Sequence, residues 1–519
     1  MGGGAMLSVA SRMALFATVF LTGAAVMVIE LLGTRLIAPF YGASLYVWSS
    51  LISVTMMALA LGYFVGGYWA DRARRTGLAL VISLAAVLTV LIPWVARPVL
   101  LATDPLGLRA GAFVSALVLF FPALTMLGMV GPFAIKLSTE RLDGIGSGAG
   151  TIYAVSTLGS VVGTLLLGFF LFPLVGSRSI LLGLGAGLLA LGLAVAYFEQ
   201  RGLHRQRALA SSVVLTVLGA LLLPPAVRAG APGQLGGGKF TLVSERETLY
   251  GWVRVIDEPK RDLRLLTSDA STIGAANISD HESRLFYQDI VQLIPSMRPG
   301  VRRALLIGQG AGHMAMVLRS RYGVSTDTIE IDPAVADAAA RHFGFVPNGR
   351  TIVGDARYEV RRLQDRYDLI ILDCFTGGTE PSHLLTVEFL QQLRGLLTDH
   401  GLLSLNLVAF ADGGRNPALA AVYRTIAGVF PDQSVFMSEP GENFNDFIFL
   451  ASRTPIDRRS GTLRADEAAW LDERVFAIDS RDGVVLSDDL NPLEKLQARK
   501  SEYYRNMIVE WLGTDTLVR

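Results

Sequence analysis

Cysteine is almost absent from this sequence, which contains only Cys374. A single thiol cannot form an intrachain disulfide, so a disulfide-stapled fold is excluded. Charged residues are also scarce, at 18% of the 519 residues, and their charges nearly cancel to a net value of +1. Proteins that bind nucleic acid normally carry a clear basic excess, so we expect no nucleic-acid partner.

Apolar residues, in contrast, are abundant. They make up 51% of the chain and give a mean hydropathy of +0.44, both above the norm for soluble domains. The excess lies in residues 1–230, which are dominated by long apolar runs, whereas residues 240–519 have a soluble composition. The chain is also too long for one ordinary domain. We therefore expect a multi-pass membrane domain followed by a soluble domain.

Seven apolar segments of the first half are long enough to cross a bilayer core, which requires about 20 residues. No basic cluster precedes the first segment, so we expect a membrane span there rather than a cleaved signal peptide. This predicts a protein of the cell (inner) membrane with the lipid bilayer as a partner. The segments cover roughly residues 13–32, 48–70, 78–96, 111–135, 149–173, 179–198 and 208–227.

Basic residues in the short loops predict the orientation of these spans, because cytoplasmic loops carry the excess of Lys and Arg. The loops after the second, fourth and sixth spans are the more basic ones, which places the N-terminus in the cytoplasm. If all seven segments cross, the soluble domain lies outside. The residues of the basic loops are Arg72, Arg74, Arg75, Lys136, Arg141, Arg201, Arg205 and Arg207, against Arg97, Arg109 and Arg178 in the other loops.

Residues 229–239 separate the two halves. They contain five glycines and one proline in eleven residues, a composition typical of a flexible linker. We therefore expect four parts: a transmembrane domain at 1–228, the linker at 229–239, a small β-strand region at 240–298 and a nucleoside-binding α/β domain at 299–519.

A βαβ unit begins the α/β domain. The apolar strand Arg303–Ile307 leads directly into a turn that contains three glycines, and a helical stretch, His313–Arg321, follows. The next strand, Thr326–Ile331, carries Glu330 near its end, where an acidic side chain can accept hydrogen bonds from both hydroxyls of a ribose. The three glycines, which allow a ligand to approach the backbone closely, are Gly308, Gly310 and Gly312.

Acidic residues also follow the next two predicted strands. Asp355 comes after Arg350–Val353 and precedes Ala356, and Asp373 comes after Tyr367–Leu372. Ligands of open parallel sheets bind at the carboxyl ends of the strands, so we expect these acids to converge with Glu330 on one crevice. The alternative is that each acid only caps the helix after its strand.

These features, taken in order, resemble the spermidine synthases, in particular the membrane-fused bacterial branch of that family. The resemblance covers residues 245–450 and implies a Rossmann-like α/β domain of the class I methyltransferase type. The residues that carry it are Glu247–Tyr250, Leu265–Asp269, Phe286–Gln288, the glycine-rich turn, Glu330–Asp332, Gly354–Asp355, Asp373 and His383–Glu388.

The resemblance implies a transferase of polyamine biosynthesis, which passes an aminopropyl group from decarboxylated S-adenosylmethionine to an amine without a metal. Glu330 then holds the ribose and Asp355 the adenine amino group, next to Ala356 and the three turn glycines. Asp373 and Tyr287 face the reacting amine as catalytic residues. The remaining residues implied in substrate binding are Tyr250, Asp269, Gln288 and Thr376.

These residue types suit the chemistry. The amine attacks a carbon next to a sulfonium, and the leaving group departs as a neutral thioether, so no general acid is required. An alkylamine has a pKa of about 10 and is mostly protonated at neutral pH. A carboxylate such as Asp373 and a phenol such as Tyr287 can orient it and help to take its proton.

Three positions depart from the family pattern. Ala311 stands where the family has an aspartate that grips the aminopropyl ammonium, Thr376 replaces the second acid of the catalytic loop, and Gly274 replaces a glutamine. Charge-assisted contacts stabilise a complex by roughly 1.5–3 kcal/mol each. These departures leave the residues implied for nucleoside binding unchanged. The identity of the amine acceptor stays open, and we expect putrescine to be a poor substrate.

Two other functions remain as alternatives. The chain can be a methyltransferase-like enzyme that uses S-adenosylmethionine, or a transporter or sensor whose soluble domain binds a nucleoside or polyamine without turnover. Residues 67–75 are similar to a loop of major-facilitator transporters. Because adenosine ligands are made inside cells, their supply favours a cytoplasmic soluble domain, against the loop charges. The oligomeric state is also open, with a homodimer through the soluble domain as one alternative.

Overall fold

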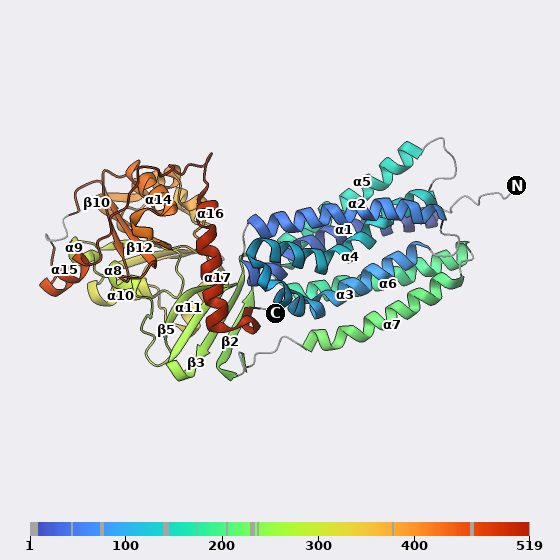
Figure 1. Cartoon of the computed structure of the whole chain (residues 1–519), viewed down its shortest axis with the longest axis horizontal. Coiled ribbons are helices and arrows are strands. Elements are labelled where there is room, and N and C mark those ends of the chain that lie inside the picture. The colour runs from blue at the N-terminus through green and yellow to red at the C-terminus, as the bar shows by residue number, and fades with distance from the viewer. Residues whose placement is uncertain are drawn as a thin grey trace. The chain divides into compact units, whose positions relative to one another are not determined.

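The structure is a computed structural model and describes residues 9–42, 45–72, 77–138, 145–172, 174–203, 206–228, 234–235, 238–375, 378–456 and 461–517. The chain forms two compact units (Figure 1). Unit 1 consists of residues 1–231, 247–249 and 514–519, and unit 2 consists of residues 232–246 and 250–513. Most of the expected linker, residues 229–233 and 236–237, lies outside the described residues.

Unit 1 is helical, and a helix lies at each of the seven predicted spans. Five apolar stretches are long enough to cross a membrane, of which Leu78–Ser138 contains two of the helices, and a shorter apolar helix covers Ala210–Leu223. Within the described residues, the five stretches therefore contain six of the seven predicted spans, and the shorter apolar helix lies at the seventh. The helices are α1 (Val9–Tyr41), α2 (Leu45–Arg72), α3 (Leu78–Thr103), α4 (Gly107–Ser138), α5 (Ile145–Leu165), α6 (Ser177–Leu203) and α7 (Gln206–Arg228).

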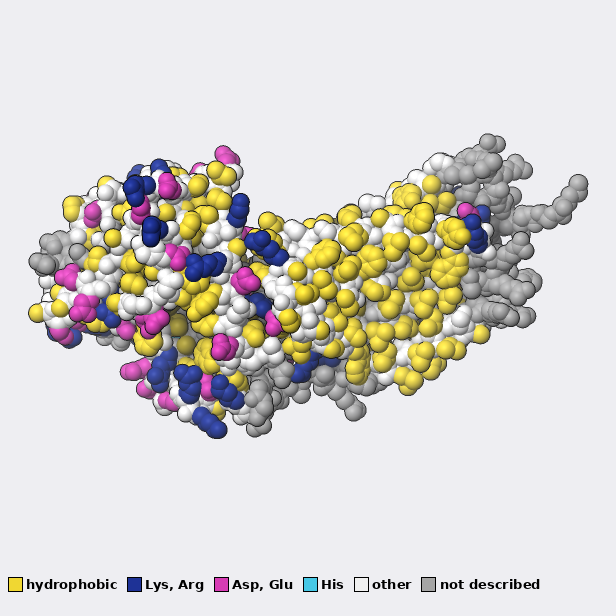
Figure 2. Space-filling model, viewed as in Figure 1, with side chains coloured by type: hydrophobic (Ala, Val, Ile, Leu, Met, Phe, Trp, Pro, Cys, Tyr) yellow, Lys and Arg dark blue, Asp and Glu magenta, His cyan; other side chains and the backbone are white. Residues whose placement is uncertain are grey.

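Glycines allow these helices to pack closely. A Cβ atom on Gly62 of α2 would lie 2.5 Å from the carbonyl oxygen of Thr125 on α4, so only glycine fits there. Small residues at helix contacts are the usual device by which membrane helices approach each other. Large apolar side chains such as Phe64 and Phe169 are instead exposed, and apolar side chains cover the visible face of the helical unit (Figure 2). These faces suit contact with lipid.

Unit 2 begins with a five-stranded sheet in the order β1-β2-β3-β4-β5. Its pairs β1–β2, β3–β4 and β4–β5 are antiparallel. The predicted small β region is therefore present. Its strands are β1 (Gln234–Leu235), β2 (Phe240–Glu247), β3 (Trp252–Glu258), β4 (Leu263–Ser268) and β5 (Ser271–Asn277).

The second sheet has seven strands in the order β11-β12-β10-β9-β6-β7-β8. The strands from β10 to β8 are parallel, β12 is antiparallel to β10, and β11 is antiparallel to β12. The predicted Rossmann-like fold is confirmed. The strands are β6 (Arg303–Ile307), β7 (Ser325–Glu330), β8 (Thr351–Val353), β9 (Tyr367–Leu372), β10 (Leu397–Phe410), β11 (Asp432–Met437) and β12 (Phe444–Ser452).

Helices flank this sheet and connect its strands. Asp332, Asp355, Thr386 and Asn416 each cap one of them through a side-chain oxygen that accepts a backbone N–H. The helices of unit 2 are α8 (Tyr287–Val291), α9 (Ile294–Met297), α10 (His313–Tyr322), α11 (Pro333–His342), α12 (Ala356–Glu359), α13 (Val387–Leu396), α14 (Pro417–Ala427), α15 (Ala465–Asp472), α16 (Leu493–Leu496) and α17 (Ala498–Leu512), whereas α18 (Thr514–Leu517) belongs to unit 1.

The central strands are buried on both faces. Leu305 and Ile370 pack into one apolar cluster with Phe389 of α13, and Leu306 and Ile371 pack into another on the opposite face. Strands covered on both sides read as continuous apolar runs rather than as alternating patterns, which explains why β6 and β9 were predicted with their observed bounds. The parallel register pairs Ile307 of β6 with Leu372 of β9, and this pairing brings the ends of both strands together.

Candidate active site

A cavity of about 1120 Å³ lies within unit 2, where the parallel strands end. Residues at or just beyond the ends of β6, β7, β8 and β9 line it, together with residues of β5, β12 and α17. Its charged lining is mainly acidic, which suits a cationic ligand. The acids are Glu330, Asp332, Asp355, Asp373, Glu439, Glu442 and Asp446, against the cations Arg261, Arg284 and Lys500.

The glycine-rich turn forms the floor between β6 and α10. Gly308, Gly310 and Gly312 all have positive φ angles, of 88°, 53° and 82°. A Cβ atom on Gly308 would lie 2.1 Å from the carbonyl oxygen of Asp373, so a side chain is excluded by space as well as by backbone conformation. All three glycines line the cavity.

Glu330 lies at the end of β7 and holds this turn. Its Oε2 accepts the backbone N–H of Gln309 at 3.1 Å and of Gly310 at 3.3 Å, and its Oε1 accepts that of Asp332 at 3.1 Å. The side chain is only 7% exposed, and burial raises its pKa to about 7. The carboxyl group therefore both shapes the turn and lines the cavity.

Asp355 both caps a helix and lines the cavity, which are the two alternatives that the sequence allowed for the acids. It is the N-cap of α12, where its Oδ1 accepts the N–H of Tyr358 at 3.1 Å, and it also lines the cavity beside Ala356. Tyr250 also lines the cavity, and partial burial, followed by the charges of Asp332 and Asp355, raises its pKa. Capping thus accounts for part of the acidic pattern and leaves Asp355 accessible.

Tyr287 and Asp373 form the central pair of the site. The phenol of Tyr287, on α8, donates a hydrogen bond of 2.6 Å to Oδ2 of Asp373, just after β9. Gln288 Nε2 donates in turn to the Tyr287 oxygen at 3.3 Å. Burial raises the pKa of Asp373, and burial together with the Asp373 charge raises that of Tyr287 well above 10. The phenol therefore stays protonated and acts as a donor.

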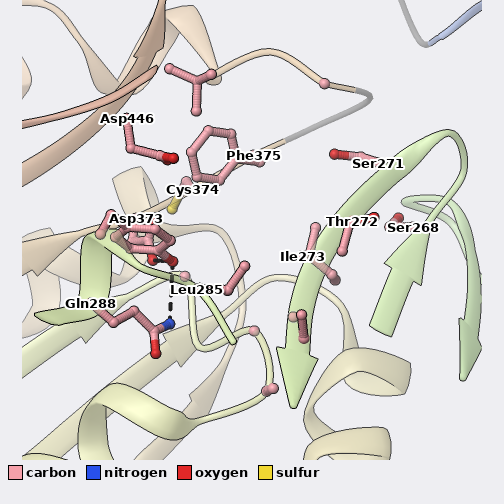
Figure 3. A pocket seen from close by; sticks show the side chains of 18 of the residues that line it. Ser268, Ser271, Thr272, Ile273, Leu285, Gln288, Asp373, Cys374, Phe375 and Asp446 are labelled. Atoms are coloured by element: carbon pink, nitrogen blue, oxygen red, sulfur yellow. Dashed lines mark hydrogen bonds between the residues drawn. The ribbon is translucent and has the colours of Figure 1, made fainter. Parts of the chain in front are cut away.

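Two residues of this network were missed in the sequence. Asn406 of β10 donates from Nδ2 to Oδ1 of Asp373 at 3.1 Å and to Oδ1 of Asp446, on β12, at 3.3 Å. Figure 3 shows Asp446 and Asp373 on one side of the pocket and Ser268, Ser271 and Thr272 on the other. The available signal was the presence of polar residues, Asn406 and Asp446 among them, inside the apolar strands Leu402–Phe410 and Phe444–Ser452.

Asp269 and Thr376 are the remaining residues that were predicted to bind substrate. Asp269 lies in the turn between β4 and β5 with a positive φ of 50°, and its Oδ1 accepts the N–H of Trp252 at 2.9 Å. It does not belong to the cavity lining formed by the described residues, so its expected contact with substrate is not supported by the geometry. Thr376 lies outside the described residues. Ala311 lines the cavity against Gly274 of β5.

Glu380 and Glu282 are two further acidic residues of unit 2. Glu380 is buried and forms an ion pair with Lys500 of α17, with 2.7 Å between Oε2 and Nζ. It also accepts hydrogen bonds from Gln497 and from the backbone of Val408. Glu282 is exposed and does not belong to the described cavity lining. Neither carboxylate therefore offers a free charge to a ligand.

Comparison with known proteins identifies the family. No protein-family model matches the chain. A polyamine aminopropyltransferase of Vibrio vulnificus is 30% identical over 254 residues, which are 47% of this chain and 82% of that protein. The chain belongs to the polyamine aminopropyltransferase family. It is therefore a member of a family of transferases, as its sequence predicted.

A second aminopropyltransferase matches more of the chain. Polyamine aminopropyltransferase 2 of Streptomyces coelicolor is 26% identical over 419 residues, which are 76% of this chain and 74% of that protein. This share is larger than unit 2, so the alignment extends into the helical unit. The similarity to this aminopropyltransferase thus includes part of the predicted membrane domain.

Similarity also extends beyond the aminopropyltransferases. An N-terminal histidine N-methyltransferase of Emericella nidulans is 29% identical over 241 residues, which are 41% of this chain and 42% of that protein. The chain thus spans less than half the length of that relative. Among solved structures, a probable spermidine synthase from Corynebacterium glutamicum is 17% identical and has a TM-score of 0.41, with 50% of this chain and 98% of that one covered.

Proposed function

We propose that this aminopropyltransferase family member transfers the aminopropyl group of decarboxylated S-adenosylmethionine to an amine, and that its helical unit anchors it in a membrane. The observation that carries the proposal is the hydrogen bond of 2.6 Å between Tyr287 and Asp373. This pair lies in the same cavity as Glu330 and the glycine-rich turn. A base for an amine and a site for a nucleoside are thus next to each other.

The nucleoside end consists of the turn, Glu330 and Asp355. In this proposal Glu330 accepts a hydrogen bond from a ribose hydroxyl, and Asp355 accepts one from the adenine amino group. Each carboxylate oxygen has two lone pairs, and backbone N–H groups already use both on Oε2 and one on Oε1 of Glu330, so one lone pair on Oε1 remains for the ribose. The positive φ glycines keep the backbone free of side chains where the nucleoside approaches.

The reaction requires one bond to form and one to break. The neutral amine donates its lone pair to the aminopropyl carbon attached to sulfur, and the C–S electrons pass to sulfur, which leaves as the neutral thioether methylthioadenosine. The amine arrives as an ammonium and gives one proton to Asp373 before the attack, and the attack then yields a secondary ammonium. The raised pKa of Asp373 makes it a better base than an exposed aspartate, and the phenol of Tyr287 fixes the orientation of its carboxylate.

The acidic lining supports the same proposal electrostatically. Both substrates are cations, a sulfonium and an ammonium, and seven acidic side chains line the cavity against three basic ones. Of these cations, Lys500 is already paired with Glu380. The field of the cavity therefore attracts both reactants.

The test uses the full-length protein in detergent, decarboxylated S-adenosylmethionine and a panel of primary amines. We expect release of methylthioadenosine together with an amine that has gained an aminopropyl group, both detected by mass spectrometry. Asp373→Asn serves as the blank, because it removes the base and keeps a side chain of nearly the same shape. Equal product from both proteins, or no product with any amine of the panel, would overturn the proposal.

Methyl transfer from S-adenosylmethionine is the second candidate function. Ala311 supports it, because the side chain that the family resemblance implies as a grip for the aminopropyl ammonium is missing. A relative named as an N-methyltransferase, 29% identical, supports it as well. The same assay with S-adenosylmethionine distinguishes the two, because a methylated amine and S-adenosylhomocysteine differ in mass from the aminopropyl products.

A further inference from the structure

A single amide nitrogen bridges two carboxylates in the cavity. Asn406 Nδ2 lies 3.1 Å from Oδ1 of Asp373 and 3.3 Å from Oδ1 of Asp446. These two oxygens are therefore at most about 6.4 Å apart, the sum of the two distances. Both aspartates line the cavity, and Figure 3 shows them on the same side of it.

This spacing suits an ammonium group. A charged N–H···O hydrogen bond measures about 2.7–2.9 Å, so one ammonium nitrogen can contact two carboxylate oxygens that are up to about 5.8 Å apart, a separation that the upper limit of about 6.4 Å set by Asn406 allows. A primary ammonium has three N–H donors, which is enough for both carboxylates and one further acceptor. Asn406 holds the two carboxylates close together without supplying a positive charge.

The protein leaves the two charges without a cation of their own. Within the described ranges, no Lys or Arg nitrogen forms an ion pair with Asp373 or Asp446, and the nearby Lys500 is 2.7 Å from Glu380. The groups that act on Asp446 are Asn406, Asp373, Glu380 and Lys500. Two carboxylates in a partly buried site that are held by a neutral amide are costly unless a ligand brings the positive charge.

We propose that Asp446 is the second acceptor-binding carboxylate of this enzyme, and that the ammonium of a primary alkylamine binds between Asp373 and Asp446. The inference rests on the proposed function and names a residue for which the family resemblance gave no role. Asp373 remains the base of the proposed function, and the Tyr287 hydrogen bond fixes the orientation of its carboxylate. Asp446 contributes a charge that binds and orients the amine.

The ionisation of Asp446 agrees with this role. Burial, followed by the charges of Asp373 and Glu380, raises its pKa to about 7, against the lowering effects of Asn406 and Lys500. Carboxyl groups whose pKa is raised strongly by burial and neighbouring charges occur preferentially at functional sites. A bound ammonium would favour the ionised form, so the amine should bind more tightly as the pH rises through 7.

Aromatic rings continue the site next to Asp446. Phe444 is two residues before Asp446 on β12 and therefore projects from the same face of the strand. Its ring centroid is 5.2 Å from that of Phe410 and 4.8 Å from that of Tyr503, and all three residues line the cavity. Apolar surface beside the two carboxylates suits the methylene groups of an alkylamine.

The test compares wild type with Asp446→Asn, which keeps the shape of the side chain next to Asn406 and removes its charge. We expect the KM for the amine to rise at least tenfold at saturating decarboxylated S-adenosylmethionine, with a smaller change in kcat. The dependence of kcat/KM on pH near 7 should weaken in the variant. Asp446→Glu should restore part of the affinity for the amine. Asp289→Asn, on the exposed side of α8 and outside the described cavity lining, is the matched control and should behave as wild type.

A binding measurement separates this inference from the proposed function. Calorimetry with methylthioadenosine already bound reports affinity for n-propylamine or putrescine without turnover. Binding to wild type that is lost in Asp446→Asn supports the inference, even where no product forms and the proposed function fails. Equal amine affinity in both proteins overturns it while turnover can continue. An equal loss of methylthioadenosine affinity in Asp446→Asn also overturns it, because that result indicates a structural role.

Discussion

The phenol oxygen of Tyr287 and Oδ2 of Asp373 are joined by a hydrogen bond of 2.6 Å although 86 positions separate the two residues in the sequence. The contact exists because α8 packs beside the sheet at the point where β9 ends. It fixes the orientation of the carboxylate before any substrate binds. Prior orientation of this kind is a main source of catalytic rate in enzymes.

The first prediction concerns this pair. Asp373→Asn should abolish transfer, because an amide cannot take the proton of the amine. Tyr287→Phe should lower kcat less, by roughly ten- to a hundredfold, because the base remains and only its orientation is lost. Affinity for methylthioadenosine should stay nearly unchanged in both variants. Single-turnover rates and calorimetry measure the two quantities, and faster transfer by Asp373→Asn than by Tyr287→Phe would contradict the assignment.

The second prediction concerns the nucleoside end. Glu330→Ala and Asp355→Ala should each weaken methylthioadenosine binding by about 1–3 kcal/mol, the usual cost of leaving a hydrogen-bonding partner unsatisfied. Glu330→Ala should also lower the melting temperature, because the backbone N–H groups of Gln309 and Gly310 lose their acceptor. Calorimetry and thermal melting test both statements. Unchanged nucleoside affinity in both variants would exclude this end of the cavity as the adenosine site.

The third prediction follows from the pKa of Asp446, which the fold raises from 3.8 to about 7. Between these values the unfolded chain releases a proton that the folded chain keeps, so wild type loses stability as the pH rises through this window. Asp446→Asn avoids that loss. It should be more stable than wild type at pH 8, by up to about 4 kcal/mol, and equal to it near pH 4. Melting temperatures across this range test the sign, and a less stable variant at pH 8 would contradict it.

The fourth prediction concerns the choice of substrate. Ala311 is buried in the cavity lining, and Ala311→Asp would place a carboxylate where the resemblance implies the grip on the aminopropyl ammonium. The variant should prefer decarboxylated S-adenosylmethionine over S-adenosylmethionine more strongly than wild type does, and the double variant with Thr376→Asp should use putrescine better. Competition assays with both sulfonium compounds measure this preference. Ala311→Ser serves as an uncharged control of similar size.

The fifth prediction concerns the side of the membrane. A cysteine at Gly238, which is exposed, should react with an impermeant maleimide in intact cells if all seven helices cross and the N-terminus is cytoplasmic. Cys374 is replaced by serine in this experiment, so that the engineered thiol is the only one. Protection of the new cysteine until the cells are lysed would place unit 2 in the cytoplasm.

Local patterns predicted much of the molecule. β6 and β9 could be read from the sequence because strands buried on both faces form continuous apolar runs, and the glycines with Glu330 indicated a βαβ unit. Asp373 was predicted because parallel strands end at the same edge of the sheet. These inferences depend only on neighbours in the sequence and on a general rule of the fold.

Long-range pairing was not predictable. Asp446 reaches the site only because β12 is antiparallel to β10, with Val408 opposite Asp446, and no local pattern specifies that register. A single aspartate in an apolar strand can equally face solvent. Asp269 was predicted to bind substrate by the family resemblance, and in the structure it lies in a turn outside the described cavity lining. Its positive φ belongs to a tight turn.

The order in which the chain is synthesised determines when the α17 wall of the cavity is added. Lys500, Tyr503 and Tyr504 line the cavity from α17, and the buried ion pair with Glu380 fixes that helix to the rest of unit 2. These residues leave the ribosome after α1 to α7 have emerged and after every strand of both sheets is complete. The α17 wall is therefore synthesised last, so a nascent chain completes this cavity only after helices α1 to α7 have been made.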